Sequence, residues 1–175
     1  MVRISQQIRV VGIRERQPLA NGLRRAFNEK SKKAWEAAGQ YFHDNLRDLR
    51  FTPEHAEEAG YYKRKGEAQS PGSKAFKRSY HGRKFYSPNR GGGRNQANPL
   101  EDSGETRSLV RTNYRIEATR NKVVIKYPGA RKLNFRNPKS RIRMNEEFKR
   151  LTDRELQLLA KVYDEKLDEL LNEGR

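Results

Sequence analysis

The longest amphipathic pattern in the chain lies between residues 19 and 50. This stretch holds no proline and only two glycines, and it is rich in Ala, Leu, Lys, Arg and Glu. Its apolar residues recur at steps of three and four, which places them on one stripe of an α-helix: Leu19, Leu23, Phe27, Ala34, Trp35, Ala38, Tyr41, Phe42, Leu46 and Leu49. We therefore predict a rod of roughly 45 Å, long enough for one end to contact another chain. Thr52-Pro53 ends it, because proline disfavours helical geometry at the preceding residue.

Strand patterns occur on both sides of the middle of the chain. Residues 2–13 are rich in Val and Ile and predict one strand or two short ones. Residues 114–119 and 122–127 have strand composition, with Arg120-Asn121 between them, which predicts a β-hairpin. Residues 107–112 predict a short strand or a turn.

Two further helices begin at threonine caps. Thr52 precedes Pro53 at a first helical position, so a short helix is expected at 53–59, ended by Gly60. Thr152 is followed three residues later by Glu155, which is a capping box. The stripe after it keeps helical spacing, so we predict a helix over 153–172, ended by Gly174 and packed on the sheet or along the first helix.

The remaining segments lack a periodic apolar pattern. Residues 61–98 mix Gly, Pro, Ser and Asn with charges, so no regular core element is expected there. Residues 130–144 are expected to form a basic connector. The predicted fold class is α+β: a long N-terminal helix and a C-terminal helix packed on a small antiparallel sheet. We expect one domain over 1–175, with 60–98 as an extended basic loop inserted in it.

Composition limits the class of protein. Only 33% of residues are hydrophobic and 35% are charged, so much of the chain should be solvated, extended or ordered by neighbours. The chain has no Cys, which excludes disulfides, thiolate catalysis and Cys-ligated metals. It lacks an apolar run of about 20 residues and a signal-peptide pattern, so we expect no membrane partner and a protein that is soluble and intracellular where it is made.

The net charge of +17 is concentrated in the middle of the chain. Residues 61–95 carry 10 Lys/Arg against one Asp/Glu, and residues 104–150 carry 14 against four. A polyanion is the partner this favours, because neutralising phosphates releases counterions. The alternatives are a solvated basic surface or a basic face that docks on an acidic protein.

Aromatic residues alternate with these cations. Aromatic faces and cations together suit stacking on bases or holding a phosphate chain. The alternative is that the aromatics anchor the loop on its own domain or on a neighbouring subunit. The candidates that face nucleic acid or a channel are Lys63, Arg64, Lys65, Lys77, Arg78, Arg83, Lys84, Arg90 and Arg94. The candidates for a subunit interface are Trp35, Phe42, Tyr61, Tyr62, Tyr80, Phe85 and Tyr86.

The sequence offers little for catalysis. His43, His55 and His81 are scattered, and no metal-binding spacing or paired carboxylate motif accompanies them. The run 91–93 of glycines lacks the Gly-Lys-Ser/Thr ending and the preceding strand of a phosphate-binding loop. We therefore expect no enzyme activity, no catalytic residues, no cofactor and no metal.

Three stretches of the chain carry a resemblance to a known family. They are residues 99–109, which read Pro-Leu-Glu-Asp-Ser-Gly-Glu-Thr-Arg-Ser-Leu, residues 50–64, and residues 127–135. Together with the order of strand, long helix, loop and strands, they resemble the tail-completion and neck proteins of tailed bacteriophages, of the lambdoid minor tail protein or Mu-like virion morphogenesis type. In that family the stretch that matches 99–109 leads into strands.

The resemblance implies a structural role in the virion. It implies a ring of identical subunits at the head–tail junction, between the portal or connector and the tail-terminator or tail-tube proteins. The ring would line a channel through which genomic DNA passes without sequence-specific contacts. The protein would be made in the host cytoplasm and end in the neck or tail. The alternative that the residues leave open is a sequence-independent nucleic-acid-binding module, associated with ribosomes or the nucleoid.

Overall fold

The structure is a computed structural model that describes residues 3–5, 21–87, 97–101, 103–135, 138 and 140–173. Its fold is α+β. The chain divides into two compact units. Unit 1 comprises Met1–Val2, Arg47–Tyr114 and Tyr127–Thr152, and unit 2 comprises Arg3–Leu46, Arg115–Lys126 and Asp153–Arg175. The expectation of a single domain stays a prediction, because compactness does not show whether the units fold independently.

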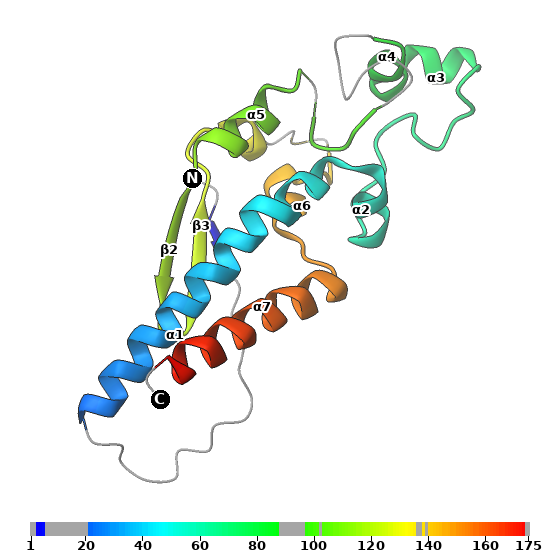
Figure 1. Cartoon of the computed structure of the whole chain (residues 1–175). Coiled ribbons are helices and arrows are strands. Elements are labelled where there is room, and N and C mark those ends of the chain that lie inside the picture. The colour runs from blue at the N-terminus through cyan, green and yellow to red at the C-terminus, as the bar shows by residue number, and fades with distance from the viewer. Residues whose placement is uncertain are drawn as a thin grey trace. The chain divides into compact units, whose positions relative to one another are not determined.

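Unit 2 is built from long elements and a small sheet (Figure 1). Its elements are β1 (Arg3–Ser5), α1 (Asn21–Tyr41), the π-helical turn η1 (Phe42–Leu46), β2 (Arg115–Thr119), β3 (Lys122–Lys126) and α7 (Asp153–Asn172). The sheet is antiparallel in the order β1-β3-β2. Ile125 of β3 lies opposite Ile4 on one side and Ile116 on the other.

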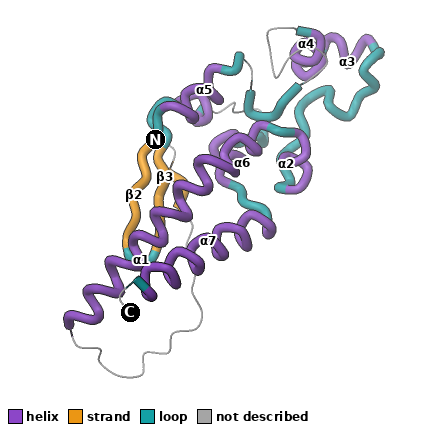
Figure 2. The backbone as a smooth tube through the Cα atoms, in the orientation of Figure 1, coloured by secondary structure: helices purple, strands orange, loops and turns teal. Residues whose placement is uncertain are grey.

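Helix α1 packs on both α7 and the hairpin (Figure 2). The core consists of Ala34, Trp35 and Ala38 from α1 and Tyr163 from α7, with the Trp35 and Tyr163 rings 4.5 Å apart. The Tyr163 hydroxyl lies 2.8 Å from the Ser31 hydroxyl, which donates to the Arg120 carbonyl at 2.7 Å. This contact joins both helices to the turn of the hairpin.

Unit 1 consists of short helical pieces joined by irregular segments. They are η2 (Arg47–Phe51), α2 (Pro53–Glu58), α3 (Lys74–Arg78), α4 (Tyr80–Tyr86), α5 (Glu105–Thr112), η3 (Arg131–Asn134) and α6 (Met144–Lys149). Phe148 of α6 lies at the centre of the apolar core, with ring centroids 5.9 Å from Phe51 and 5.5 Å from Tyr127. All three rings are buried.

Polar side chains from α6 hold the turn after α2. The buried Glu147 carboxylate accepts from the Tyr62 N–H at 3.0 Å and forms an ion pair with Arg64 at 2.6 Å. Arg150 donates to the carbonyls of Ala59 and Gly60. Because buried charges are costly unless they are paired, these contacts specify one path for residues 59–64.

Several predictions are confirmed. The fold class is as expected, and the hairpin forms with Arg120-Asn121 as its turn. The C-terminal helix spans Asp153–Asn172 and packs along α1. Thr52 caps α2, because its hydroxyl accepts from the His55 N–H at 3.3 Å. Thr152 and Glu155 are both buried, and their capping box stays a prediction.

The long helical segment is confirmed over residues 21–51, but only its first 21 residues are α-helical. The chain then turns π-helical in η1 and 3-10 helical in η2. At this change the Asn45 side-chain amide donates to the Tyr41 carbonyl at 3.2 Å, and such side-chain bonds compete with the regular backbone ladder. The stripe is also not buried throughout, since Leu23 is 62% exposed. Within the predicted strand region 2–13, a strand forms at Arg3–Ser5, and residues 2 and 6–13 lie outside the described residues, as do residues 19–20 and Gly174.

Two predictions in unit 1 are wrong, and a third segment is more ordered than expected. Residues 61–98 were expected to lack regular elements, yet they contain α3 and α4. Residues 107–112 were expected as a strand or turn, yet they belong to α5. The connector 130–144 contains η3 and the start of α6. These helices have four to eight residues, which is too short for apolar periodicity to identify.

Candidate nucleic-acid interface

Helices α3 and α4 each begin at a serine. Ser73 caps α3 by accepting from the Phe76 N–H at 3.1 Å. Ser79 ends α3 and caps α4, because its hydroxyl accepts from the Gly82 N–H at 2.9 Å and donates to the Phe76 carbonyl at 2.7 Å. The two helices therefore follow each other with no linker except Ser79. Serine caps satisfy backbone groups at both helix starts and stabilise helices this short.

An aromatic cluster gives this pair of helices a core of its own. Phe76 is 2% exposed. The centroid of its ring lies 5.5 Å from that of Phe85, 5.7 Å from that of His81 and 6.0 Å from that of Tyr86. All three contacts are edge-on, which is the favoured geometry of aromatic pairs. Gly82 packs directly on the Phe76 backbone, where a side chain would have no room. Residues 73–87 are therefore locally ordered and are not an extended loop.

Most of the cations in this region are exposed and unpaired. Residues 61–87 carry eight Lys/Arg against one Asp/Glu. Six of these side chains are exposed and form no ion pair or side-chain hydrogen bond with any other residue in the described ranges. They are Lys63, Lys65, Lys74, Lys77, Arg78 and Arg83. Because no carboxylate in those ranges forms an ion pair with them, their charge is available to an anionic partner.

Two predicted cations have structural roles instead. Arg64 forms the ion pair with Glu147 and also donates to the Tyr62 carbonyl at 2.6 Å. Lys84 is buried, and its ammonium donates to the Asn98 carbonyl at 2.5 Å. These two side chains are therefore not available to line a channel. Arg90 and Arg94 lie outside the described residues.

The aromatic candidates divide in the same way. Trp35, Phe42 and Tyr61 are buried within the chain, so they leave no surface for another subunit. Phe85 is half-buried in the cluster around Phe76. Tyr62, Tyr80 and Tyr86 keep 47%, 46% and 44% of their surface exposed, and these three remain candidates for contact with a partner.

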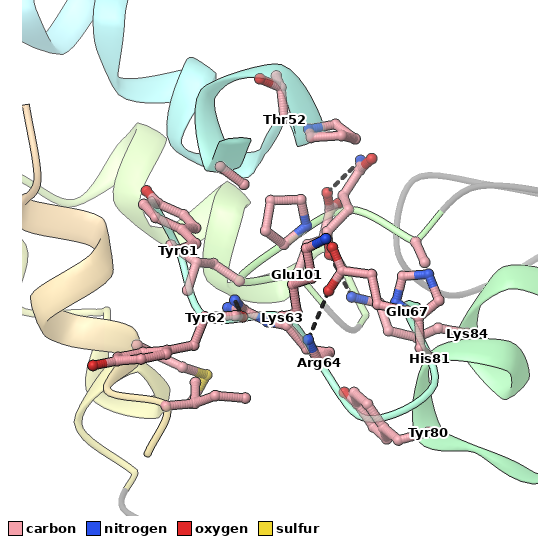
Figure 3. Close-up of a pocket in the computed structure, with 18 of the residues that line it drawn as sticks. Thr52, Tyr61, Tyr62, Lys63, Arg64, Glu67, Tyr80, His81, Lys84 and Glu101 are labelled. Atoms are coloured by element: carbon pink, nitrogen blue, oxygen red, sulfur yellow. Dashed lines mark hydrogen bonds between the residues drawn. The ribbon is translucent and has the colours of Figure 1, made fainter. Parts of the chain in front are cut away.

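A hollow of about 1290 Å³ lies beside these residues within unit 1. In Figure 3, Tyr61 and Tyr62 lie on one side of it, and Tyr80, His81 and Lys84 lie on the other. Its lining includes several cations, and it also includes the carboxylates Glu54, Glu57, Glu67 and Glu101. Of the exposed cations, Lys63 and Lys65 line this hollow, whereas Lys74, Lys77, Arg78 and Arg83 do not. Four carboxylates disfavour a phosphate inside the hollow, so the exposed cations of α3 and α4 are the candidate site for an anion.

His81 of α4 has a shifted pKa. Burial lowers the pKa of His81 from its usual 6.5, Glu67 opposes that change, and the positive charges of Lys84 and Arg64 add to it. A neutral imidazole is therefore favoured at neutral pH. Across the ranges that the structure describes, no three His, Asp or Glu side chains gather as a metal site would require. None of the helices in those ranges is long and apolar enough to cross a membrane.

The stretch 99–109 forms a tight turn into α5. Leu100 and Gly104 adopt positive φ angles of 57° and 79°, and Gly104 is the residue before the helix. The Glu101 carboxylate accepts from the Asn98 amide at 3.0 Å and lies 3.8 Å from the Arg107 guanidinium. A left-handed glycine followed by Glu105 begins a helix here, so the stretch leads first into α5 and then, from Arg115, into the strands of the hairpin.

The chain was compared with protein families, curated proteins and solved structures. No protein-family model, curated protein or solved structure matches the chain. The resemblance to phage neck proteins therefore stays a prediction.

Sequence reasoning missed the residues that order unit 1. Glu147 lies next to Glu146 and Lys84 next to Arg83, so the sequence does not distinguish them from their charged neighbours, and only their burial shows that they are anchors. The Ser73 and Ser79 caps were detectable, since each serine precedes a short run that can be helical. Their separation by only six residues hid them from a search for longer helices.

Proposed function

We propose that this chain is a structural protein that contacts the backbone of nucleic acid through unit 1, and that it does so as an adaptor at the head–tail junction of a tailed phage. One observation carries the nucleic-acid part: six exposed cations on and beside α3 and α4 form no ion pair in the part of the chain that the structure describes. Unit 1 holds 22 Lys/Arg against 10 Asp/Glu, or +12, whereas unit 2 holds 17 against 12, or +5.

The chemistry of this surface suits phosphates better than base edges. Four of the six exposed cations are lysines, which bind phosphate as point charges without the planar fork that matches guanine. Contacts of this kind position a duplex but carry no sequence information. The half-exposed Tyr62, Tyr80 and Tyr86 add flat faces beside the cations.

The adaptor role rests on the resemblance of residues 50–64, 99–109 and 127–135 to neck and tail-completion proteins. In this role several copies form a ring between the portal or connector and the tail-terminator or tail-tube proteins. The exposed cations then face DNA in the channel, where weak and uniform attraction lets the genome slide. The exposed Leu23, Phe135 and Leu171 are apolar surface that neighbouring subunits can cover.

A second candidate is a monomeric nucleic-acid-binding module. The local core of α3 and α4 favours it, because those helices hold their cations in place without any neighbour. The two candidates share the phosphate contact and differ in assembly. Native mass spectrometry of the purified protein separates them, since an adaptor gives a closed ring of one stoichiometry and a module gives a monomer.

Salt-dependent binding tests the shared contact. The affinity for two duplex DNAs of unrelated sequence is measured by fluorescence anisotropy over a range of salt concentrations. The test variant changes Lys74, Lys77, Arg78 and Arg83 to Gln. The control changes Arg24, Arg25, Lys32 and Lys33 to Gln; these are exposed on α1 in unit 2, and the charge removed is the same.

We expect equal affinity for the two sequences. Each lost phosphate contact lowers the slope of log affinity against log salt by about 0.9, so the test variant should lose up to about 4 units of slope. The control variant should keep most of the slope. Equal losses in both variants would show that net charge alone attracts DNA, and strong preference for one sequence would contradict a backbone contact.

A further inference from the structure

Strand β2 is an edge strand. The sheet order is β1-β3-β2, so β2 pairs with β3 on one side, and no other strand in the described ranges pairs with its second side. An edge strand presents unpaired backbone groups that can join another strand. Such edges are usually short and charged, and β2 has five residues with Arg115 and Glu117 exposed.

The register of the hairpin shows which backbone groups point outward. A two-residue turn, Arg120-Asn121, connects Thr119 to its partner Lys122, which makes these two residues a hydrogen-bonded pair. Hydrogen-bonded and non-hydrogen-bonded pairs alternate along an antiparallel ladder. The N–H and C=O groups of Ile116 and Ala118 therefore point away from β3, in the plane of the sheet.

The side chains of β2 alternate between two faces. Ile116 and Ala118 face α1: the Ile116 Cγ2 would lie 3.1 Å from a Cβ at Gly39, and Ala118 packs on the core around Trp35. Arg115, Glu117 and Thr119 lie on the exposed face. Arg115 and Glu117 thus place charges along one face of an edge whose outward backbone groups pair with no other strand in the described ranges.

From this geometry we infer that β2 pairs with β2 of a second copy of this chain, antiparallel and centred on Ile116. In this register Ile116 lies opposite Ile116 of the second copy and exchanges both backbone hydrogen bonds with it. Arg115 then lies opposite Glu117 of the second copy, and Glu117 lies opposite Arg115. Both charge pairs occupy non-hydrogen-bonded positions, where opposed side chains are closest.

The charges select this register over its neighbours. Outward backbone groups occur at every second residue, so the pairing can shift only in steps that keep these groups opposed. One step in one direction places Arg115 opposite Arg115, and one step in the other places Glu117 opposite Glu117. Like charges directly opposite each other are destabilising. The charges therefore oppose pairing in the two shifted registers and favour pairing in the register centred on Ile116.

The Glu117 carboxylate already forms an ion pair within the hairpin. Lys126 of β3 contacts its carboxylate. A carboxylate offers about four lone-pair positions, so it can accept from Lys126 and from an arginine of the second copy together. Arg115 is exposed and has no ion pair with another residue in the described ranges.

The contact is two-fold and weak. A pair of five-residue strands buries far less than the roughly 1,200 Å² of a standard interface, so we expect association that depends on protein concentration. A two-fold contact joins two copies and cannot propagate around a ring, so it is distinct from any ring contact. It also involves unit 2, whereas the proposed contact with nucleic acid involves unit 1.

Disulfide trapping tests the register directly, because the chain contains no Cys. Two full-length variants are prepared, Arg115→Cys and Glu117→Cys, and oxidised separately and as an equal mixture. In the mixture each Cys meets the other across a non-hydrogen-bonded pair about 4.5 Å apart at Cα, within the range for a disulfide. The second charge pair, Glu117 of one variant with Arg115 of the other, stays intact.

We expect a cross-linked dimer that is several-fold more abundant in the mixture than in either variant alone. The control is Lys161→Cys, which places a Cys at an exposed position of α7. Equal yields in all samples, the control included, would show random collision and overturn the inference. So would no dimer in any sample, or a dimer that forms best with one variant alone, since each of these excludes the proposed register.

A charge reversal gives an independent readout without Cys. Arg115→Glu and Glu117→Arg each place like charges opposite each other, so sedimentation should show a several-fold loss of dimer in either variant. The double variant restores opposite charges and should recover the dimer. Circular dichroism must show an intact fold, because Glu117→Arg also lies beside Lys126. Dimerisation of folded single variants at the wild-type level would overturn the inference, whatever the result of the DNA-binding test.

Discussion

Different interactions stabilise the interiors of the two units. Unit 2 packs two helices of 20 and 21 residues and a hairpin around Trp35 and Tyr163. Unit 1 has no described helix longer than eight residues, and buried polar anchors such as Glu147 and Lys84 complete a small aromatic core. Long amphipathic elements bury enough apolar area to be stabilised by packing alone, whereas short helices also need specific polar contacts with other segments.

This difference matches the distribution of charge. Unit 2 is nearly balanced at +5, and unit 1 carries +12. A unit with so much positive charge repels itself, so its fold depends on the few carboxylates that pair with cations. Asp48 illustrates the effect: burial tends to raise its pKa, but the hydrogen bond and charge of Arg47, with the charges of Arg107 and Arg111, lower it. The following predictions test the contrast between the units.

Removal of the Glu147 carboxylate should have the largest effect. Glu147→Ala leaves the Tyr62 N–H and the Arg64 guanidinium without their partner, and breaking a buried pair costs roughly 3–5 kcal/mol. Hydrogen exchange should show loss of protection at the Tyr62 amide. The control Glu146→Ala changes an exposed neighbour and should cost less than about 1 kcal/mol. Unchanged protection at Tyr62 would show that apolar packing alone holds unit 1.

A methyl group added at each of the two glycines of α1 should change the stability of the protein by different amounts. In Gly39→Ala the new Cβ would lie 2.6 Å from the Val123 Cγ2, so overpacking should cost about 1–3 kcal/mol. Gly22 has no atom within 4 Å of such a Cβ, and Gly22→Ala should be neutral or stabilise by up to about 1 kcal/mol. Urea unfolding followed by the fluorescence of Trp35, the only Trp, measures both. Equal effects would mean that α1 and the hairpin do not pack closely.

Removal of one hydroxyl from the core of unit 2 should have a smaller effect than the loss of Glu147. Tyr163→Phe removes the 2.8 Å contact with Ser31, while Ser31 keeps its bond to the Arg120 carbonyl. We expect a loss of about 0.5–1.5 kcal/mol in the same urea experiment. Tyr41→Phe, at a half-buried tyrosine of α1, is the control and should change stability very little. A loss as large as that of Glu147→Ala would contradict the view that polar anchors matter less in unit 2.

The smallest predicted effect concerns pH. His81 has a pKa lowered in the folded state, chiefly by burial, so the unfolded chain binds a proton more readily. The stability from neutral His81 is therefore complete above the usual pKa of 6.5 and declines as the pH falls below it. An NMR titration, assigned with His81→Gln, should place the midpoint of His81 below 6.5. A midpoint at or above 6.5 would show that His81 is not desolvated in the cluster around Phe76.

Sequence patterns predicted unit 2 much better than unit 1. The hairpin followed from strand composition around Arg120-Asn121, and α7 followed from its spacing of apolar residues. In unit 1, α5 was mistaken for a strand because Leu109 and Val110 are adjacent apolar residues in a short run. For the candidate site, the sequence showed where cations are concentrated, but not that Lys84 and Arg64 are anchors.

The order of residues was sufficient for the fold class, the hairpin, the ends of α7 and the location of positive charge, because these depend on periodicity and composition within short windows. Which cations are exposed, which tyrosines are buried and which strand lies at the edge of the sheet depended on contacts between distant segments. Glu147 meets Arg64 across 83 residues, and Ser31 meets Tyr163 across 132. No local pattern encodes such pairs, because they form only when separate elements pack together.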